Sequence, residues 1–172
     1  MAIVFELSAN FGSDEDAAKR FCVEVKRNYQ TLDVMGHQIN LHDPLISGFQ
    51  DYTGQPSFEV SIIPMATGYG VALDQKNQRI HLDASELLEL GRKLYDLLRD
   101  VDGYQVALVG WDIDWINLAE LREDWKEEII TGQFDGLVIA HNVRQHLPQS
   151  NHFVSFDDQH DWIPDKGSNT RL

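Results

Sequence analysis

The segment 104–111 (YQVALVGW) constrains the fold of this chain more than any other, because its apolar residues do not alternate with polar ones. Neighbouring side chains in a strand point to opposite faces, so Val106, Ala107, Leu108 and Val109 would place apolar groups on both. Such a strand is typical of the interior of a sheet that is covered on both sides. Segment 136–141 (GLVIAH) has the same character, and we expect both to be central strands.

Apolar residues spaced three and four apart predict two long helices. The first spans residues 14–29, with Ser13 as its expected N-cap. The second spans residues 84–100 and carries a line of leucines along one side. Asp83 and Glu86 have the spacing of a capping box at its start.

A third helix is predicted over residues 118–131, ending at Gly132. The residues expected to face the core along this helix are Leu118, Leu121, Trp125 and Ile129. Because these positions recur with helical spacing, we expect one continuous helix.

Alternating apolar and polar residues predict the remaining strands. Residues 2–8 and 152–156 each indicate one strand, and residues 57–83 indicate an antiparallel meander. Residues 31–43 indicate one or two short strands. The stretch 43–56 (DPLISGFQDYTGQP) contains two prolines and two glycines, and we interpret it as an irregular loop.

These elements predict a single domain of the α+β class, spanning residues 1–164. The expected architecture is a mixed, largely antiparallel sheet with about three helices packed on it. The length of 172 residues also fits one domain. We expect the last segment, 165–172, to be a frayed tail.

The chain is strongly acidic, with 28 Asp and Glu against 14 Lys and Arg and a net charge of −14. This balance counts against direct binding to nucleic-acid phosphates, which depends on Lys and Arg. It favours fast encounter with a basic partner. Half of the net charge falls within residues 100–128, where nine acids are opposed only by Arg122 and Lys126.

Composition predicts a cytoplasmic protein without membrane contact. The N-terminal apolar run stops at Glu6 and has no basic residues before it, so it does not resemble a secretory signal. No apolar stretch approaches the ~18 residues that a membrane span needs. The single cysteine, Cys22, falls on the apolar side of the first predicted helix, where we expect a buried and unreactive thiol.

The sequence contains no strong catalytic signature. It has no G-x-S-x-G elbow, no H-E-x-x-H, no paired C-x-x-C and no G-x-G-x-x-G loop. These absences count against the commonest enzyme classes, and we therefore expect neither a catalytic residue nor a cofactor.

One alternative is a small metal-dependent enzyme or ligand-binding protein. His81 and Asp83 would lie on one face of a strand, and a His-x-Asp pair with a distant His is the ligand set of many non-haem iron oxygenases. A simpler interpretation is that Asp83 caps the following helix. The other residues in this alternative lie in the His-rich C-terminal region: His141, His146, His152, His160, Asp157, Asp158 and Asp161.

The leading hypothesis is an acidic protein-interaction module, such as an inhibitor or immunity-type protein that binds a basic partner. Trp and Arg anchors dominate binding energy at many interfaces, and charge complementarity speeds association. A third hypothesis is a subunit that self-associates into a homo-oligomer. The expected partner-binding residues are Trp111, Asp112, Asp114, Trp115, Glu120, Glu123 and Asp124.

Overall fold

Strand β6 (Val106–Trp111) lies in the middle of a seven-stranded sheet, as its two apolar faces predict. Ala107 and Val109 belong to the hydrophobic core on one face of the sheet. Val106 belongs to the core on the other face, and Leu108 packs against it. The computed structural model describes residues 2–51, 53–113, 116 and 118–167.

The sheet is antiparallel at every pair of neighbouring strands. Its order is β4-β5-β1-β6-β7-β9-β8. The single-domain α+β class is confirmed. The other strands of the sheet are β1 (Phe5–Asn10), β4 (Leu45–Gln50), β5 (Pro56–Ile62), β7 (Val138–Ala140), β8 (Val154–Ser155) and β9 (His160–Trp162).

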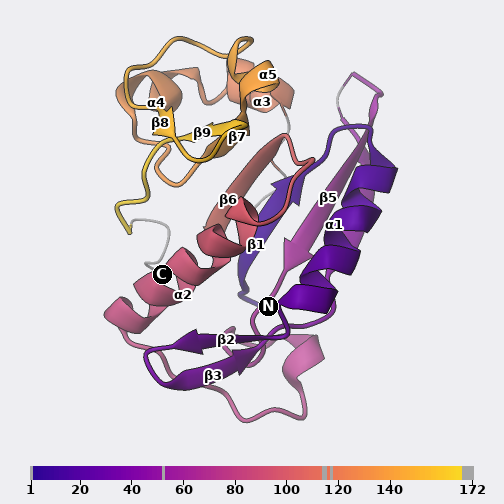
Figure 1. Cartoon of the computed structure of the whole chain (residues 1–172), viewed down its shortest axis with the longest axis vertical. Coiled ribbons are helices and arrows are strands. Elements are labelled where there is room, and N and C mark those ends of the chain that lie inside the picture. The colour runs from indigo at the N-terminus through magenta and orange to yellow at the C-terminus, as the bar shows by residue number, and fades with distance from the viewer. Residues whose placement is uncertain (1, 52, 114–115, 117, 168–172) are drawn as a thin grey trace.

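Two long helices, α1 (Glu15–Asn28) and α2 (Ala84–Arg99), cover the first face (Figure 1). The cap of α1 is Asp14 rather than Ser13, because the Asp14 carboxylate accepts from the Ala17 N–H at 2.8 Å. At the start of α2, Asp83 and Glu86 form the predicted capping box.

Three short helices cover the other face, gathered with β7, β8 and β9 in one half of the molecule (Figure 1). They are α3 (Leu118–Glu123), α4 (Lys126–Thr131) and α5 (His141–Arg144). Within the described ranges, none of the helices combines the length and apolar character needed to cross a membrane.

The predicted helix over 118–131 is wrong as one element, because it is broken between α3 and α4. The N–H groups of Asp124 and Trp125 both point to the Glu120 carbonyl, at 2.8 and 3.1 Å, so the regular ladder stops there. Leu121 and Ile129 are buried as expected, but the break turns Trp125 outward and leaves it 43% exposed. Gly132 ends α4 in the left-handed conformation, as predicted.

The predicted loop over residues 43–56 is also wrong, because β4 lies within it and forms a hairpin with β5. The sequence LISGFQ shows no alternation because β4 is the outermost strand and exposes side chains on both faces. A separate hairpin of β2 (Thr31–Val34) and β3 (His37–Asn40) confirms two strands on either side of Gly36.

The predicted meander over residues 57–83 holds only for its first strand. After β5, Tyr69 makes a single bridge to Ile3, and a 3₁₀ helix, η1 (Ala72–Asp74), takes the place of a strand. Ile80 and Leu82 still pack against the core. Their apolar spacing therefore reports burial without strand pairing.

The C-terminal end pairs differently from the prediction for residues 152–156. Only β8 forms there, and it pairs with β9, which the sequence analysis had not assigned to a strand. Within the expected tail, Lys166 donates from its backbone N–H to Asp135 at 2.9 Å and from Nζ to the Gly132 carbonyl at 3.2 Å.

Candidate partner-binding site

An acid-lined pocket of about 310 Å³ opens between α1, the end of α2 and the turn that joins β8 to β9. Five carboxylates from these three segments line it: Glu24, Asp100, Asp102, Asp157 and Asp158. Asp100 is the C-cap of α2, where the helix dipole adds further negative potential. A cleft lined by one sign of charge focuses the field and raises the local concentration of cations.

Three of these carboxylates are free of polar contacts with the part of the chain that the structure describes. The side chains of Glu24, Asp102 and Asp158 are exposed and make no hydrogen bond or ion pair with the described residues. Asp100 instead accepts a hydrogen bond from the Tyr29 hydroxyl. Burial, together with Asp100, raises the pKa of that hydroxyl to about 12, so it remains a donor.

Arg99, the arginine in the pocket wall, is already paired elsewhere. Its guanidinium lies 2.8 Å from the Asp96 carboxylate and 4.3 Å from the centre of the Phe156 ring. The pocket therefore keeps a negative potential despite this cation, and it can accept a cationic group from outside.

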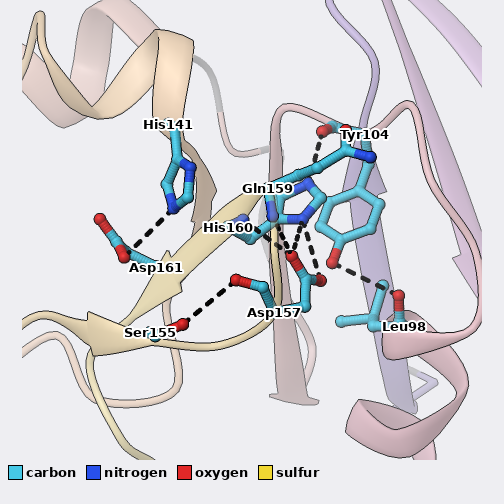
Figure 2. Close-up of polar contacts among 8 residues, drawn as sticks. All are labelled: Leu98, Tyr104, His141, Ser155, Asp157, Gln159, His160 and Asp161. Carbon is cyan, nitrogen blue, oxygen red and sulfur yellow. Dashed lines mark hydrogen bonds and ion pairs between the residues drawn. The ribbon is translucent and has the colours of Figure 1, made fainter.

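The wall formed by the β8–β9 turn is held in place by His160, as Figure 2 shows. Its Nδ1 lies 2.9 Å from the Asp157 carboxylate, and its Nε2 lies 3.2 Å from the Tyr104 carbonyl oxygen. The imidazole also stacks on the Tyr104 ring, with 4.1 Å between the centroids. The imidazole is thus held at both ring nitrogens and across its face.

Asp157 is the acceptor that makes this arrangement work. Partial burial acts to raise its pKa, but the Gln159 N–H and the contacts with the His160 ring outweigh that effect and lower it. The contact between Asp157 and the buried His160 ring thus fixes the turn. Asp158, the next residue, is exposed and lies in the pocket wall.

The predicted partner-binding residues Trp111 and Asp112 are engaged within the fold. Trp111 is partly buried, and its ring packs edge-on against Phe5 at 5.2 Å. Asp112 has a positive φ of 43°, and its N–H donates to the Val4 carbonyl at 2.7 Å. Its carboxylate accepts a hydrogen bond of 2.7 Å from the Val4 N–H. In a regular antiparallel ladder the backbone carbonyl of Asp112 would accept this bond instead.

The other predicted partner-binding residues are divided. Glu123 and Asp124 are exposed at the break between α3 and α4, whereas Glu120 is half-buried. Asp114 and Trp115 lie outside the described residues. Trp125, which the sequence placed in the core, instead packs edge-on against Phe134, with 5.2 Å between the ring centroids, and remains 43% exposed.

A pair of carboxylates that the sequence analysis did not single out lies on the second face of the sheet. Glu59 is 5% exposed, and its carboxylate accepts from the Ile116 N–H at 3.3 Å. Burial raises the pKa of Glu59 to about 7, and the Glu6 carboxylate adds to this effect. Burial also raises the pKa of Glu6, and Asp112 contributes.

Ser8 lies beside this pair and offsets part of the rise in the Glu59 pKa. Its buried hydroxyl reaches no partner at hydrogen-bonding geometry among the described residues, so it acts on Glu59 as a nearby dipole. Perturbed carboxyls of this kind are common at functional sites, but Glu59 is too deeply buried here to contact a partner directly.

The residues of the metal alternative do not converge. Asp83 is used in the capping box of α2, and His81 is exposed. His141 lies 3.3 Å from Asp161, away from the buried His160 (Figure 2). His146 and His152 are exposed. Within the described part of the chain, no group of three or more His, Cys, Asp or Glu residues is placed to hold a metal ion.

Comparison with protein-family models, with curated proteins and with solved structures gives no significant match for this chain. Its function must therefore be inferred from its own residues.

Four of the five acids in the pocket belong to segments that the sequence marks as unusual, but nothing in the sequence indicates that these segments meet. Asp100 and Asp102 belong to the acidic run 100–128, and Asp157 and Asp158 belong to the His-rich C-terminal region. Glu24 was missed. It lies on the polar side of a helix, where an exposed acid gives no signal of its own.

Proposed function

We propose that this chain is an acidic protein-binding module whose pocket receives a Lys or Arg side chain of a basic protein partner. The observation that carries the proposal is the convergence of Glu24, Asp102 and Asp158 on one pocket, each with its carboxylate exposed and unpaired among the described residues. Three unlinked segments contribute them, so ordinary surface acidity is a weaker explanation.

The net charge supports the same proposal. A charge of −14 attracts a basic partner over a distance of about 10 Å at ~0.1 M salt, beyond which counterions screen it. The pocket would then orient the partner, because the field is strongest where carboxylates of one sign line a concave surface. Association steered in this way is fast and falls steeply with ionic strength.

An inhibitor or immunity-type protein for a basic toxin or nuclease has these properties: small size, high negative charge and no need for its own catalytic groups. We propose this as the more specific role. A rigid wall suits it, because a preordered surface loses little conformational freedom on binding. The contact of Asp157 with the buried His160 ring supports that rigidity.

The test begins with capture of partners from native lysate on the immobilised chain, followed by elution with a salt gradient. Binding of the recovered protein is then compared between two variants of equal charge. Asp102→Asn with Asp158→Asn removes two carboxylates from the pocket. Glu123→Gln with Asp124→Asn removes two from the α3–α4 corner and is the matched control.

We expect the pocket variant to weaken binding at least about 10-fold, since a lost charge contact at an interface commonly costs 1.4 kcal/mol or more. The corner variant should bind nearly as well as the unaltered chain. Loss of binding in the corner variant alone would instead assign the interface to the surface predicted from sequence, with Trp125 as its aromatic anchor. Unchanged binding in both variants would refute the acidic interface.

A further inference from the structure

Strand β4 is the only long open edge among the described strands of the sheet. It is six residues long and pairs on one side with β5. The opposite edge is formed by β8, which has two residues. An outermost strand presents a row of unpaired backbone N–H and C=O groups to which another extended chain can add.

The register shows which backbone groups of β4 point outward. Phe58 exchanges hydrogen bonds of 2.8 Å with the Phe11 N–H and the Gly12 carbonyl, so its backbone groups point toward β1. Bonding direction alternates along an antiparallel strand, and Ser57, Glu59 and Ser61 must therefore bond to β4.

Their partners Leu45, Ser47 and Phe49 consequently bond inward. Ile46, Gly48 and Gln50 are left pointing away from the sheet. The position of Pro56 agrees with this assignment. Pro56 has no N–H, and it lies opposite Gln50 at a pair of residues that exchanges no hydrogen bonds.

This edge lacks the usual protection against strand addition. Natural edge strands often carry a lysine, an inward-pointing charge or a proline, or are very short. The segment Leu45–Gln50 has no charged residue and no proline. Ile46, Gly48 and Gln50 are all exposed, and Leu45 and Ile46 add apolar surface, with exposed fractions of 42% and 39%.

The charges at the two ends of β4 decide what kind of chain fits. Asp43 precedes the strand and Asp51 follows it. Hydrogen bonds from the Thr53 hydroxyl and the turn N–H groups lower the pKa of Asp51, so it is ionised. Asp43 is exposed and has Lys26 at 2.6 Å, which neutralises part of its charge.

A second copy of this chain fits poorly at the edge. Antiparallel pairing of two β4 strands about a two-fold axis would bring Asp43 of each copy close to Asp51 of the other, in two molecules that each carry −14. Like charges placed opposite each other destabilise strand pairing. A segment with cationic residues at its ends would meet opposite charges at both.

We propose that β4 is a docking edge for an extended basic segment of another protein, about five to seven residues long, with β-branched residues in its middle and Lys or Arg at its ends. The segment would add as an eighth strand through the backbone groups of Ile46, Gly48 and Gln50. This inference goes beyond the acid-lined pocket and does not depend on it, because β4 contributes no residue to that pocket.

The test uses a synthetic heptapeptide, Lys-Thr-Ile-Thr-Ile-Thr-Lys, and two control peptides. One control carries N-methyl groups on alternate backbone amides, and the other has Glu in place of both Lys residues. Binding is followed by amide hydrogen exchange and by titration. The peptide should protect the N–H groups of Ile46, Gly48 and Gln50, and both controls should bind at least about 10-fold more weakly.

Two variants with the same substitution separate the edge from general effects of charge. Ile46→Lys places a cation on β4 and should weaken peptide binding at least about 10-fold. Val154→Lys changes an exposed residue of the short edge strand β8 and should leave binding unchanged. The pocket variant Asp102→Asn with Asp158→Asn should also bind the peptide normally, which distinguishes this test from that of the proposed function.

Three results would overturn the inference. The first is that the N-methylated peptide binds as tightly as the unmodified one. The second is that the unmodified peptide binds Ile46→Lys as tightly as it binds the unaltered chain. The third is protection of the same three amides that rises with protein concentration in the absence of peptide, because it would assign the edge to a second copy of the chain.

Discussion

Replacing Glu59 by Gln should stabilise the protein by an amount that grows as the pH rises from about 4.5 to 7. In the unfolded chain a glutamate ionises near 4.5, whereas burial raises the pKa of folded Glu59 to about 7. Between these values the unfolded state binds fewer protons than the folded state, so stability falls as pH rises through this window. Above about pH 7 both states are ionised and the loss becomes constant.

The size of the effect follows from this difference in pKa. A difference of about 2.5 corresponds to about 3 kcal/mol, since each pKa unit is worth 1.36 kcal/mol. Gln cannot ionise, and its amide oxygen can still accept from the Ile116 N–H. We therefore expect Glu59→Gln to gain about 3 kcal/mol at pH 8 and less than about 1 kcal/mol at pH 5.

Urea denaturation at pH 5, 6, 7 and 8, followed by circular dichroism, measures this gain. The matched control is Glu123→Gln, which removes the same charge from an exposed position of α3 outside the pocket. The control should change little across the range, because charge loss at an exposed site affects only weak long-range repulsion. A gain in Glu59→Gln that does not grow with pH, or that equals the gain in the control, would refute the assignment of a buried carboxyl with a raised pKa.

Three further predictions concern single residues. His160→Ala should cost about 3 kcal/mol in thermal or urea unfolding, because it removes a buried ring that stacks on Tyr104 and holds Asp157; a loss within about 0.5 kcal/mol would contradict that role. Gly132→Ala should lower the melting temperature more than Gly54→Ala, because both glycines have a positive φ but only at Gly132 would the new Cβ lie 2.4 Å from a His152 ring atom; equal shifts would remove the steric part of this explanation. The Cys22 thiol should react with a disulfide reagent at pH 8 about 10-fold more slowly in the folded than in the unfolded chain, since burial raises its pKa to about 11; equal rates would show that the thiol is not shielded.

The sequence was informative wherever a pattern reports burial on both sides of an element. Strand β6 was predicted because a central strand needs apolar residues on consecutive positions. Helix α2 was predicted because a long amphipathic stripe and a capping box coincide. Both signals are local, and the tertiary structure preserves them.

The errors occur where tertiary contacts override local signals. Strand β4 forms because its backbone pairs with that of β5. Its own residues show no alternation of apolar and polar side chains and no strong strand composition. The break before α4 is likewise invisible in the spacing of Leu121, Trp125 and Ile129. That break converts Trp125 from an expected core residue into an exposed one.

The candidate site depends on the order of the strands, which no local pattern encodes. The β8–β9 turn reaches the end of α2 because β9 pairs with β7, two places from β6 in the sheet. The sequence showed acids at 100–102 and at 157–158, separated by more than fifty residues, and gave no reason to join them. Only this pairing brings the two groups to one pocket.

Net charge alone does not distinguish a binding surface from an ordinary acidic one, and our proposal therefore rests on the distribution of paired and unpaired acids. Many carboxylates of this chain are consumed by the fold, as Asp14 and Asp83 are at helix caps and Asp112 is beside β1. The carboxylates in the pocket are of two kinds: some stabilise the pocket wall, and others are exposed and have no partner among the described residues. Asp157 stabilises the turn so that Asp158 can be presented without a partner of its own. Carboxylates that lie close together without partners repel one another, and the packing of the fold does not require this repulsion. Their clustering in one concave pocket therefore favours a role in binding a cationic partner.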